Sequence, residues 1–274
     1  MSKIPVSVLV VTKNEQDHIA RCLKALSDFD EVIVIDSYSD DNTVELAQAV
    51  GAIVKNFKWN DSYPKKRQWC LDNIEIKHDW VFWVDADEVL TSDLIEEIRC
   101  LFGNKQQCAG YFVKGKYIWQ EKCLEHGLMN NKLALFDRRK IEFPVIDDLD
   151  IKGMGEIEGH YQPILKSAYS SEKIGQLTAV LFHYAYDDES QWLARHKRYA
   201  HWEAQMSFNE AWPKDPVAWR DAIKKLTRTS IFRPYMMFIY SYIIRLGFLD
   251  GNKGYKFALS RKKYCEMVLK ELRK

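Results

Sequence analysis

The feature that most constrains the fold of this chain is the alternation of strand and helix patterns along its first hundred residues. Val6–Val11 reads VSVLVV, a continuous and mostly β-branched run typical of a strand buried on both faces of a parallel sheet. Similar patterns alternate from there onward, with strands expected at 31–37, 52–57 and 80–85 and helices at 19–26, 43–50, 64–73 and 91–101. This order predicts an α/β fold, with a mostly parallel sheet and helices on both of its faces.

Length and cysteine usage narrow the class of protein further. A chain of 274 residues, 47% of them hydrophobic, can bury the core of one large domain, so a disordered or fibrous chain is excluded. The six cysteines include no CxxC pair, which argues against a structural zinc site. The apolar run near the N-terminus is too short for a signal peptide and lacks a small-residue cleavage site, so a cytoplasmic location is expected.

The pattern changes after about residue 103. Residues 111–119 alternate as an antiparallel strand does, 132–136 form a second such strand, and the chain is helical from about 190 onward. We therefore expect three parts, at 1–105, 106–189 and 190–274, of which the last is a helical, basic C-terminal extension.

The strongest chemical signal is three carboxylates in four residues, Asp85, Asp87 and Glu88, at the end of a hydrophobic strand. Like charges at such a position repel one another unless a cation neutralises them. Mg²⁺ or Mn²⁺ suits the position, because these ions take one or two carboxylates and complete their coordination with phosphate and water. Alternate residues of an extended segment point the same way, so Asp85 and Asp87 are the candidate metal ligands. Alternatively, Asp87 and Glu88 only favour the N-terminus of the following helix.

Other strand ends and one helix start carry polar residues that would meet at the same edge of the sheet. Asp36 ends the second strand and could accept a hydrogen bond from a ribose or a base, or cap the next turn. Three cations, at 65–67, begin a helix whose dipole disfavours them, so they indicate either an anionic ligand or a solvated basic turn. The chain has no GxGxxG and no GxxxxGK[ST] motif, and NAD-binding and P-loop functions lose their main support.

Four ordered motifs, VSVLVVTKNE, VIVIDSYSDDNT, YPKKRQW and WVFWVDADE, resemble those of family 2 glycosyltransferases with the Rossmann-like GT-A fold. The resemblance is strongest to the small bacterial branch that includes lipopolysaccharide core glucosyltransferases. It implies an inverting transferase that uses a UDP-sugar, such as UDP-glucose, together with a divalent metal. By position it assigns the nucleotide-sugar site to Thr12, Asn14, Glu15, Asp36, Lys66, Arg67, Asp85, Ala86 and Asp87, with Asp36 and Arg67 at the base and Asp85 and Asp87 at the ribose, metal and diphosphate. Residues 1–105 would then bind the donor and 106–189 the acceptor.

The catalytic base is less well defined by the resemblance. An inverting displacement needs a carboxylate that takes the proton of the acceptor hydroxyl. The branch usually has a His-Glu pair here, whereas this chain reads GEIEGHY at 155–161. Glu158 is the first candidate and Glu156 the second, with Asp147 and Asp148 as rivals. For the acceptor site the candidates are His160, His183, Arg195, Arg198 and Tyr199. Plain helix packing is the preferred explanation for most residues of the helical stretch, and a lone histidine is more often satisfied in the core or exposed.

The C-terminal segment is strongly basic. Residues 224–274 hold 13 Lys and Arg against 3 Asp and Glu, a net charge of +10. The apolar run at 234–244 is too short to cross about 30 Å of hydrocarbon. A peripheral contact with an anionic membrane, at the inner face of the cytoplasmic membrane, is therefore expected, and a solvated helical face is the alternative. Nucleic-acid binding is not expected, because the basic excess is confined to this tail and lies beside an apolar run.

The resulting hypothesis is an enzyme, a metal-dependent glycosyltransferase that extends a cell-surface glycan such as the lipopolysaccharide inner core. A second hypothesis is an inactive GT-A module that binds a nucleotide or glycan. A third, a sugar nucleotidyltransferase, is disfavoured because Thr12–Glu15 contains none of the glycines of that class's N-terminal loop.

Overall fold

The computed structural model describes residues 2–104, 106–148, 162–186, 189–212 and 218–274. Its internal contacts divide the chain into two compact units. Unit 1 comprises Met1–Tyr117, Asn130–Pro144 and Gln162–Tyr184, and unit 2 comprises Ile118–Met129, Val145–Tyr161 and Ala185–Lys274. The three-part division expected from the sequence stays a prediction.

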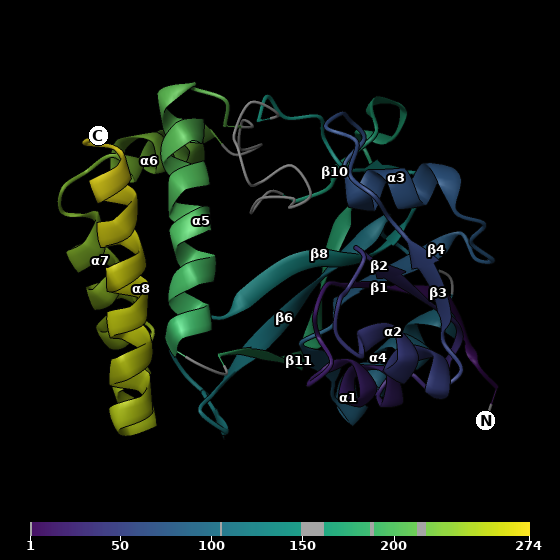
Figure 1. The fold of residues 1–274 in the computed structure, drawn as a ribbon. Coiled ribbons are helices and arrows are strands. Elements are labelled where there is room, and N and C mark those ends of the chain that lie inside the picture. The colour runs from purple at the N-terminus through teal and green to yellow at the C-terminus, as the bar shows by residue number, and fades with distance from the viewer. Residues whose placement is uncertain (1, 105, 149–161, 187–188, 213–217) are drawn as a thin grey trace. The chain divides into compact units, whose positions relative to one another are not determined.

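Unit 1 is built on a mixed sheet with the strand order β3-β2-β1-β4-β8-β6-β11-β5 (Figure 1). Four strands from the N-terminal part of the chain run parallel to one another: β1 (Ile4–Thr12), β2 (Phe29–Asp36), β3 (Ile53–Asn56) and β4 (Trp80–Asp85). The sheet continues through β8 (Asn130–Asp137), β6 (Gly110–Trp119), β11 (Ile174–Tyr186) and β5 (Glu88–Leu90), with antiparallel pairing of β4 with β8, β6 with β8 and β11 with β5. The α/β fold class predicted from the sequence is confirmed.

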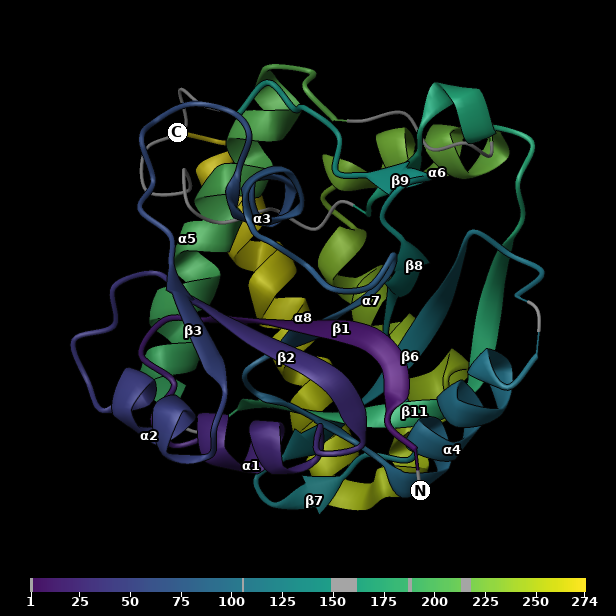
Figure 2. The same cartoon turned by 90° about the vertical axis from the view of Figure 1, so that its right-hand side faces the viewer.

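Helices cover both faces of the parallel half of this sheet (Figure 2). One face carries α1 (Ile19–Lys24), α2 (Thr43–Ala49) and α4 (Ser92–Phe102), and the other carries α3 (Lys66–Asn73). The strand β1 shows why its sequence is a continuous apolar run: Val8 and Val10 pack into the first core and Leu9 into the second. Both faces of a central strand are buried, so most of its positions are apolar.

The short strand β5 is one of several strands that the sequence analysis did not predict, and the long strand β11 is another. Strand β5 spans only three residues, too few to show a period of two, and its partner β11 lies about ninety residues away in the sequence. The predicted helix therefore begins later than the acidic cluster, at Ser92, where Thr91 accepts a hydrogen bond from the backbone N–H of Leu94. The alternative role of Glu88, at the N-terminus of a helix, is wrong because Glu88 belongs to a strand.

Unit 2 is mainly helical. Its elements are β7 (Lys122–Cys123), α5 (Glu189–Phe208), α6 (Ala218–Arg228), α7 (Arg233–Ile239), a π-helical turn (Tyr240–Ile244), a 3₁₀ turn (Gly247–Asp250) and α8 (Gly251–Glu271). The helices α5 and α8 run side by side (Figure 1) and enclose a core of Ala200, Tyr264, Cys265 and Val268. Within the described ranges, no helix combines the length and the apolar character needed to cross a bilayer.

Three short elements complete the fold: β9 (Ile141–Glu142), β10 (Ile164–Leu165) and a 3₁₀ turn (Ser167–Tyr169). β9 and β10 form a separate antiparallel pair.

Candidate functional site

The predicted site residues of the strands lie at one edge of the sheet in unit 1. In the parallel register Thr12 is opposite Asp36, and Val11 is opposite Asp85. The side chain of Thr12 is buried, and its hydroxyl has no hydrogen-bond partner among the described residues. Ser37, directly after β2, is also buried, and its hydroxyl likewise has no hydrogen-bond partner among the described residues. Buried polar groups are nearly always paired, so two such hydroxyls at one sheet edge indicate a place where a polar ligand binds.

Asp36 is already engaged by the turn that follows it. One carboxylate oxygen accepts from the backbone N–H of Ser39 at 2.8 Å and the other from the Ser39 hydroxyl at 2.5 Å. The turn-capping role left open by the sequence is therefore what the structure displays. Each carboxylate oxygen can accept more than one hydrogen bond, so a contact with a nucleotide is compatible with this turn and stays a prediction.

Asn14 and Glu15 join the loop after β1 to the loop after β2. The side-chain carbonyl oxygen of Asn14 accepts from the backbone N–H of Asp40 at 3.0 Å. The backbone N–H of Asn14 donates to the Ser39 hydroxyl at 2.8 Å. The N–H of Glu15 donates to the Thr43 hydroxyl at 2.8 Å. These bonds hold the two loops together at the edge of the sheet, which gives both residues a structural role beside the predicted binding role.

Asp85 ends β4 between two cations. Arg67, on α3, donates to one carboxylate oxygen at 2.9 Å, and Lys132, on β8, donates to the other at 3.0 Å. Burial alone would raise the pKa of Asp85, but Lys132 and Arg67 outweigh it and hold this pKa below its usual range. Asp85 is therefore ionised, and its charge is balanced by the protein itself.

Lys132 is the functional residue that the sequence analysis missed. It also donates to Glu88, whose side chain is fully buried and whose second carboxylate oxygen has no partner among the described residues. Burial, and then the neighbouring Asp85, raise the pKa of Glu88 against the opposing effect of Lys132. The position of Lys132 follows from the strand register: β4 and β8 pair Trp80 with Asp137, and the same register extended along both strands places position 132 opposite 85. That register is a long-range property, which a single sequence does not reveal.

Asp87 points to a different partner. Its carboxylate lies 3.2 Å from Nε2 of His183, on β11, and the backbone N–H of Tyr184 donates to its carbonyl oxygen at 2.8 Å. Burial lowers the pKa of His183, yet Asp87 and then Glu88 outweigh this and raise it to about 8. The His183 ring also stacks on Tyr117, with ring centroids 5.2 Å apart.

The expectation that Asp85 and Asp87 point the same way from an extended segment is wrong. The chain turns at Ala86 and Asp87, and the backbone N–H of Asp85 donates to the Glu88 carboxylate at 2.9 Å across that turn. Ala86 is buried, and the thiol of Cys22, on α1, contacts the Asp85 carbonyl at 3.7 Å. The turn therefore sends one aspartate towards cations and the other towards an imidazole.

Among the described residues no cluster of three or more His, Cys, Asp or Glu side chains has the arrangement of a metal site. The pair of Asp87 and His183 nevertheless fits Mn²⁺, a transition metal that accepts a carboxylate and an imidazole, whereas Mg²⁺ favours oxygen ligands and would use Asp87 alone; both ions fill their other positions with phosphate and water. Two neighbouring ligands of an octahedral ion lie about 3 Å apart, close to the 3.2 Å between the carboxylate oxygen and Nε2. Asp85 fits a metal less well, since both of its oxygens already bind cations.

The cations at the start of α3 are not equivalent. Arg67 lies over the rings of Trp83 and Phe143, 5.8 Å from each centroid, while it binds Asp85. Lys66 is half-buried, and Lys65, which precedes the helix, is fully buried. The basic helix start is therefore packed into the protein, and the interpretation as a solvated turn does not hold for Lys65 and Arg67.

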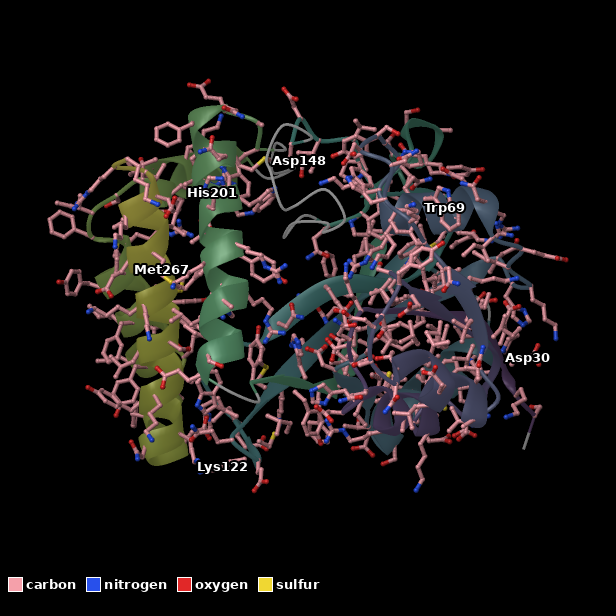
Figure 3. All side chains as sticks on the ribbon, in the orientation of Figure 1. Asp30, Trp69, Lys122, Asp148, His201 and Met267 are labelled. Atoms are coloured by element: carbon pink, nitrogen blue, oxygen red, sulfur yellow. The ribbon has the colours of Figure 1, made fainter. Side chains whose placement is uncertain are left out.

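The predicted base and acceptor residues divide into three groups. Glu156, Glu158 and His160 lie outside the described residues. Asp147 is exposed, whereas Asp148 is buried and accepts from the indole N–H of Trp202 at 3.2 Å. Figure 3 labels Asp148 and, on α5, His201, the neighbour of Trp202. Arg198 is exposed on α5, and Arg195 and Tyr199 are half-buried there. These assignments stay predictions.

A mixed sheet whose parallel strands end in Thr12, Asp36 and an Asp-Ala-Asp turn is the architecture of the GT-A glycosyltransferases. The sequence profile of glycosyl transferase family 2 matches residues 7–143, half of the chain, and the chain belongs to this family.

Individual relatives match part of the chain. An uncharacterized glycosyltransferase of Rickettsia typhi, RT0209, is 30% identical over 146 residues, 50% of this chain and 48% of that protein. The lipopolysaccharide core biosynthesis glycosyltransferase LpsC of Rhizobium meliloti is 28% identical over 116 residues, 40% of this chain and 42% of that protein. The chain thus spans no more than about half the length of these curated relatives.

Among solved structures, the mannosyltransferase PcManGT from Pyrobaculum calidifontis, in complex with GDP-Man and Mn²⁺, matches the whole chain. It is 13% identical, with coverage of 100% of this chain and 88% of that one and a TM-score of 0.54. At this identity the likeness concerns the fold.

Proposed function

We propose that the chain transfers a sugar from a UDP-sugar, such as UDP-glucose, to a cell-surface glycan acceptor such as the lipopolysaccharide inner core, with Mg²⁺ or Mn²⁺ as cofactor. The observation that carries the proposal is the meeting of Thr12, Asp36 and Asp85 at one sheet edge, beside the pair formed by Asp87 and His183. The family membership and the kinship with LpsC support a glycan acceptor.

The residues of the sheet edge have distinct tasks in this proposal. Asp36 and Arg67 address the base, and the ionised Asp85 accepts from a ribose hydroxyl while Arg67 and Lys132 hold it in place. Asp87 and His183 would hold the cation, which would supply charge neutralisation for the diphosphate leaving group. His183 would have to be neutral to serve as a ligand.

Transfer itself forms a bond between the acceptor oxygen and the anomeric carbon and breaks the bond to the diphosphate. A carboxylate takes the proton of the acceptor hydroxyl as the attack proceeds. Glu158, then Glu156, and Asp147 are the proposed bases. Asp148 is the weaker candidate, because it is buried and bonded to Trp202. A peripheral membrane contact through residues 224–274, at the cytoplasmic face, would bring the chain to a glycolipid acceptor.

The test is thermal unfolding of the protein with UDP, GDP, CDP or dTDP, each with and without Mn²⁺. A ligand at about 100 times its Kd stabilises the folded state by roughly 2.7 kcal/mol, which raises the Tm of a chain of this size by several degrees. We expect a UDP-specific rise that requires Mn²⁺ and is absent in Asp87→Ala. The matched control is Asp93→Ala, which removes an exposed carboxylate from the first turn of α4 and should keep the rise.

Release of UDP from a panel of UDP-sugars, with truncated core glycolipids as acceptors, then identifies donor and acceptor. No rise in Tm with any nucleotide would refute the donor site and leave a non-catalytic module as the better description. A rise that survives Asp87→Ala would refute the metal assignment alone.

A further inference from the structure

Most of the large hydrophobic side chains that the structure exposes belong to one segment of unit 2. Of the 22 such residues among those described, 15 lie between Ile223 and Leu259, which is less than one seventh of the chain. Several are more than half exposed, including Leu226 at 78%, Phe232 at 64% and Ile244 at 63%. Isolated exposed apolar residues need no explanation, but a concentration of this kind marks an interaction surface.

These side chains follow a regular spacing along α7 and the π-helical turn. Exposed apolar pairs occur at 231–232, 235–236, 239–240 and 243–244, and we call these eight residues the apolar stripe. In an uninterrupted α-helix a repeat of four drifts around the axis, because a turn takes 3.6 residues. The wider turn at Tyr240–Ile244, with an Arg245 N–H to Tyr240 carbonyl bond of 2.8 Å, compensates for this drift. The last pair therefore stays on the same face as the pairs at 235–236 and 239–240, while the pair at 231–232 lies in the turn directly before α7.

The opposite face of the same helix is packed inside unit 2. Phe238 and Tyr242 stack on each other at 5.4 Å between ring centroids, and both meet the ring of Tyr255 on α8. Met237 packs against the buried cluster of Ala200, Tyr264, Cys265 and Val268. The helix thus already buries one apolar face, and the apolar stripe is a second face that the described part of the chain does not cover.

The sequence around the apolar stripe is rich in cations, although Lys262 is paired with Glu266 and Arg233 with Glu203. Residues 223–249 contain five Lys and Arg and no Asp or Glu, and residues 224–274 carry a net +10. The ammonium group of Lys262, on α8, lies 4.9 Å from the ring centroid of Tyr235 in the apolar stripe. A second copy of the chain would bring two such cationic segments together. An anionic lipid surface, by contrast, complements both the charge and the apolar side chains.

We propose that the apolar stripe docks on an anionic bilayer, with its side chains in the headgroup and upper acyl region and the surrounding Lys and Arg at the phosphates. The helix from Arg233 to Ile244 has twelve residues and is about 18 Å long, so it lies in the interface and does not cross it. Tyr235 and Tyr240 suit this position, because tyrosine favours the membrane–water boundary. This inference depends on the proposed function in one respect only, namely that the acceptor is a glycolipid.

The experiment is sedimentation of the full chain with vesicles of phosphatidylcholine, with and without about 30 mol% phosphatidylglycerol, in the absence of donor and metal. We expect binding to the anionic vesicles that weakens with rising salt and falls at least tenfold on neutral vesicles. The double variant Phe232→Ser/Ile244→Ser should lose at least tenfold in binding. The matched control Val50→Ser/Ile53→Ser removes two apolar side chains of unit 1 that are 53% and 49% exposed, and it should bind as the wild type does.

Folding and donor binding are followed separately in all three proteins, as the Tm and its rise with UDP and Mn²⁺. Loss of vesicle binding with this rise retained supports docking by the apolar stripe. The inference is overturned if the wild type does not bind anionic vesicles or if the double variant still binds them. Neither result bears on the proposed donor site. A concentration-dependent dimer that the double variant dissociates also overturns it, in favour of a second copy as the occupant. Failure of the UDP response alone bears on the proposed function and leaves the membrane contact intact.

Discussion

The substitution Lys132→Met probes the charge balance beneath the proposed site. Lys132 is 13% exposed and binds both Asp85 and the fully buried Glu88. Methionine keeps most of the side-chain length and removes only the charge and its donors. Asp85 retains Arg67, whereas Glu88 loses the cation that binds it directly and keeps only the longer-range attraction of His183. The variant therefore leaves a buried carboxylate without its ion-pair partner.

Removing one partner of a buried ion pair costs about 3–5 kcal/mol, because the remaining charge is desolvated without its partner. Here the cost depends on pH in a defined direction. The pKa of Glu88 is already raised by burial, and loss of Lys132 raises it further. Below the unfolded pKa of about 4.5 Glu88 is protonated in both states and the penalty is small. Above it the unfolded state loses the proton first, so stability falls by about 1.4 kcal/mol per pH unit until Glu88 ionises in the folded protein.

The assay is the Tm of wild type and variant between pH 5 and 8 in EDTA. We expect the deficit of Lys132→Met to grow with pH and to reach about 10 °C near pH 8. The matched control is Lys77→Met, which breaks an ion pair with Asp30 in which the lysine is 58% exposed and which should matter far less. Equal effects of the two substitutions, or a deficit of Lys132→Met that does not change with pH, would refute the idea that Lys132 compensates a buried carboxylate.

Three further results are expected. In EDTA, His183→Gln should destabilise the protein below pH 6.5 and lose that effect above about pH 8, since the raised pKa of His183 means that its proton stabilises the fold only at lower pH; a Tm difference that does not change with pH would show that the pair with Asp87 contributes nothing. Asp250→Ala removes the acceptor of the Glu125 and His126 amides at 3.2 and 2.9 Å, and should lower the free energy of unfolding by about 1–3 kcal/mol in urea titrations while the UDP response persists. Asp148→Asn should change the Tm and leave UDP release within about threefold of wild type, whereas a loss of about a hundredfold or more would identify it as the base.

The parallel half of the fold was predictable because its signals are local. The apolar runs at β1, β2 and β4 mark strands buried on both faces, and the stripe of Ile19, Cys22 and Leu23 marks the face of α1 that packs on them. Predicted and observed bounds of β4 agree residue for residue. The antiparallel strands β6 and β8 were also expected, but their order in the sheet was not, since pairing depends on contacts far apart in the sequence.

The site was predictable in part, for the same reason. Polar residues at the ends of parallel strands must share an edge, so Thr12, Asp36 and Asp85 could be grouped from sequence alone. Lys132 could not, because its place opposite Asp85 follows from the antiparallel register of β8 with β4. His183 was singled out, but for the acceptor, and only the pairing of β11 with β5 brings it to Asp87.

The turn at the end of β4 separates the tasks of its two aspartates. An extended segment would have pointed both carboxylates at one ion, where they would repel each other until the ion arrived. In the turn, Asp85 is neutralised by Arg67 and Lys132, and Asp87 pairs with the imidazole of His183. One consequence is that the protein can fold without metal, since the buried acids are balanced internally. Asp87 and His183 would supply only two ligands to the proposed cation, so in this proposal a nucleotide diphosphate supplies others, and we expect nucleotide and cation to bind cooperatively.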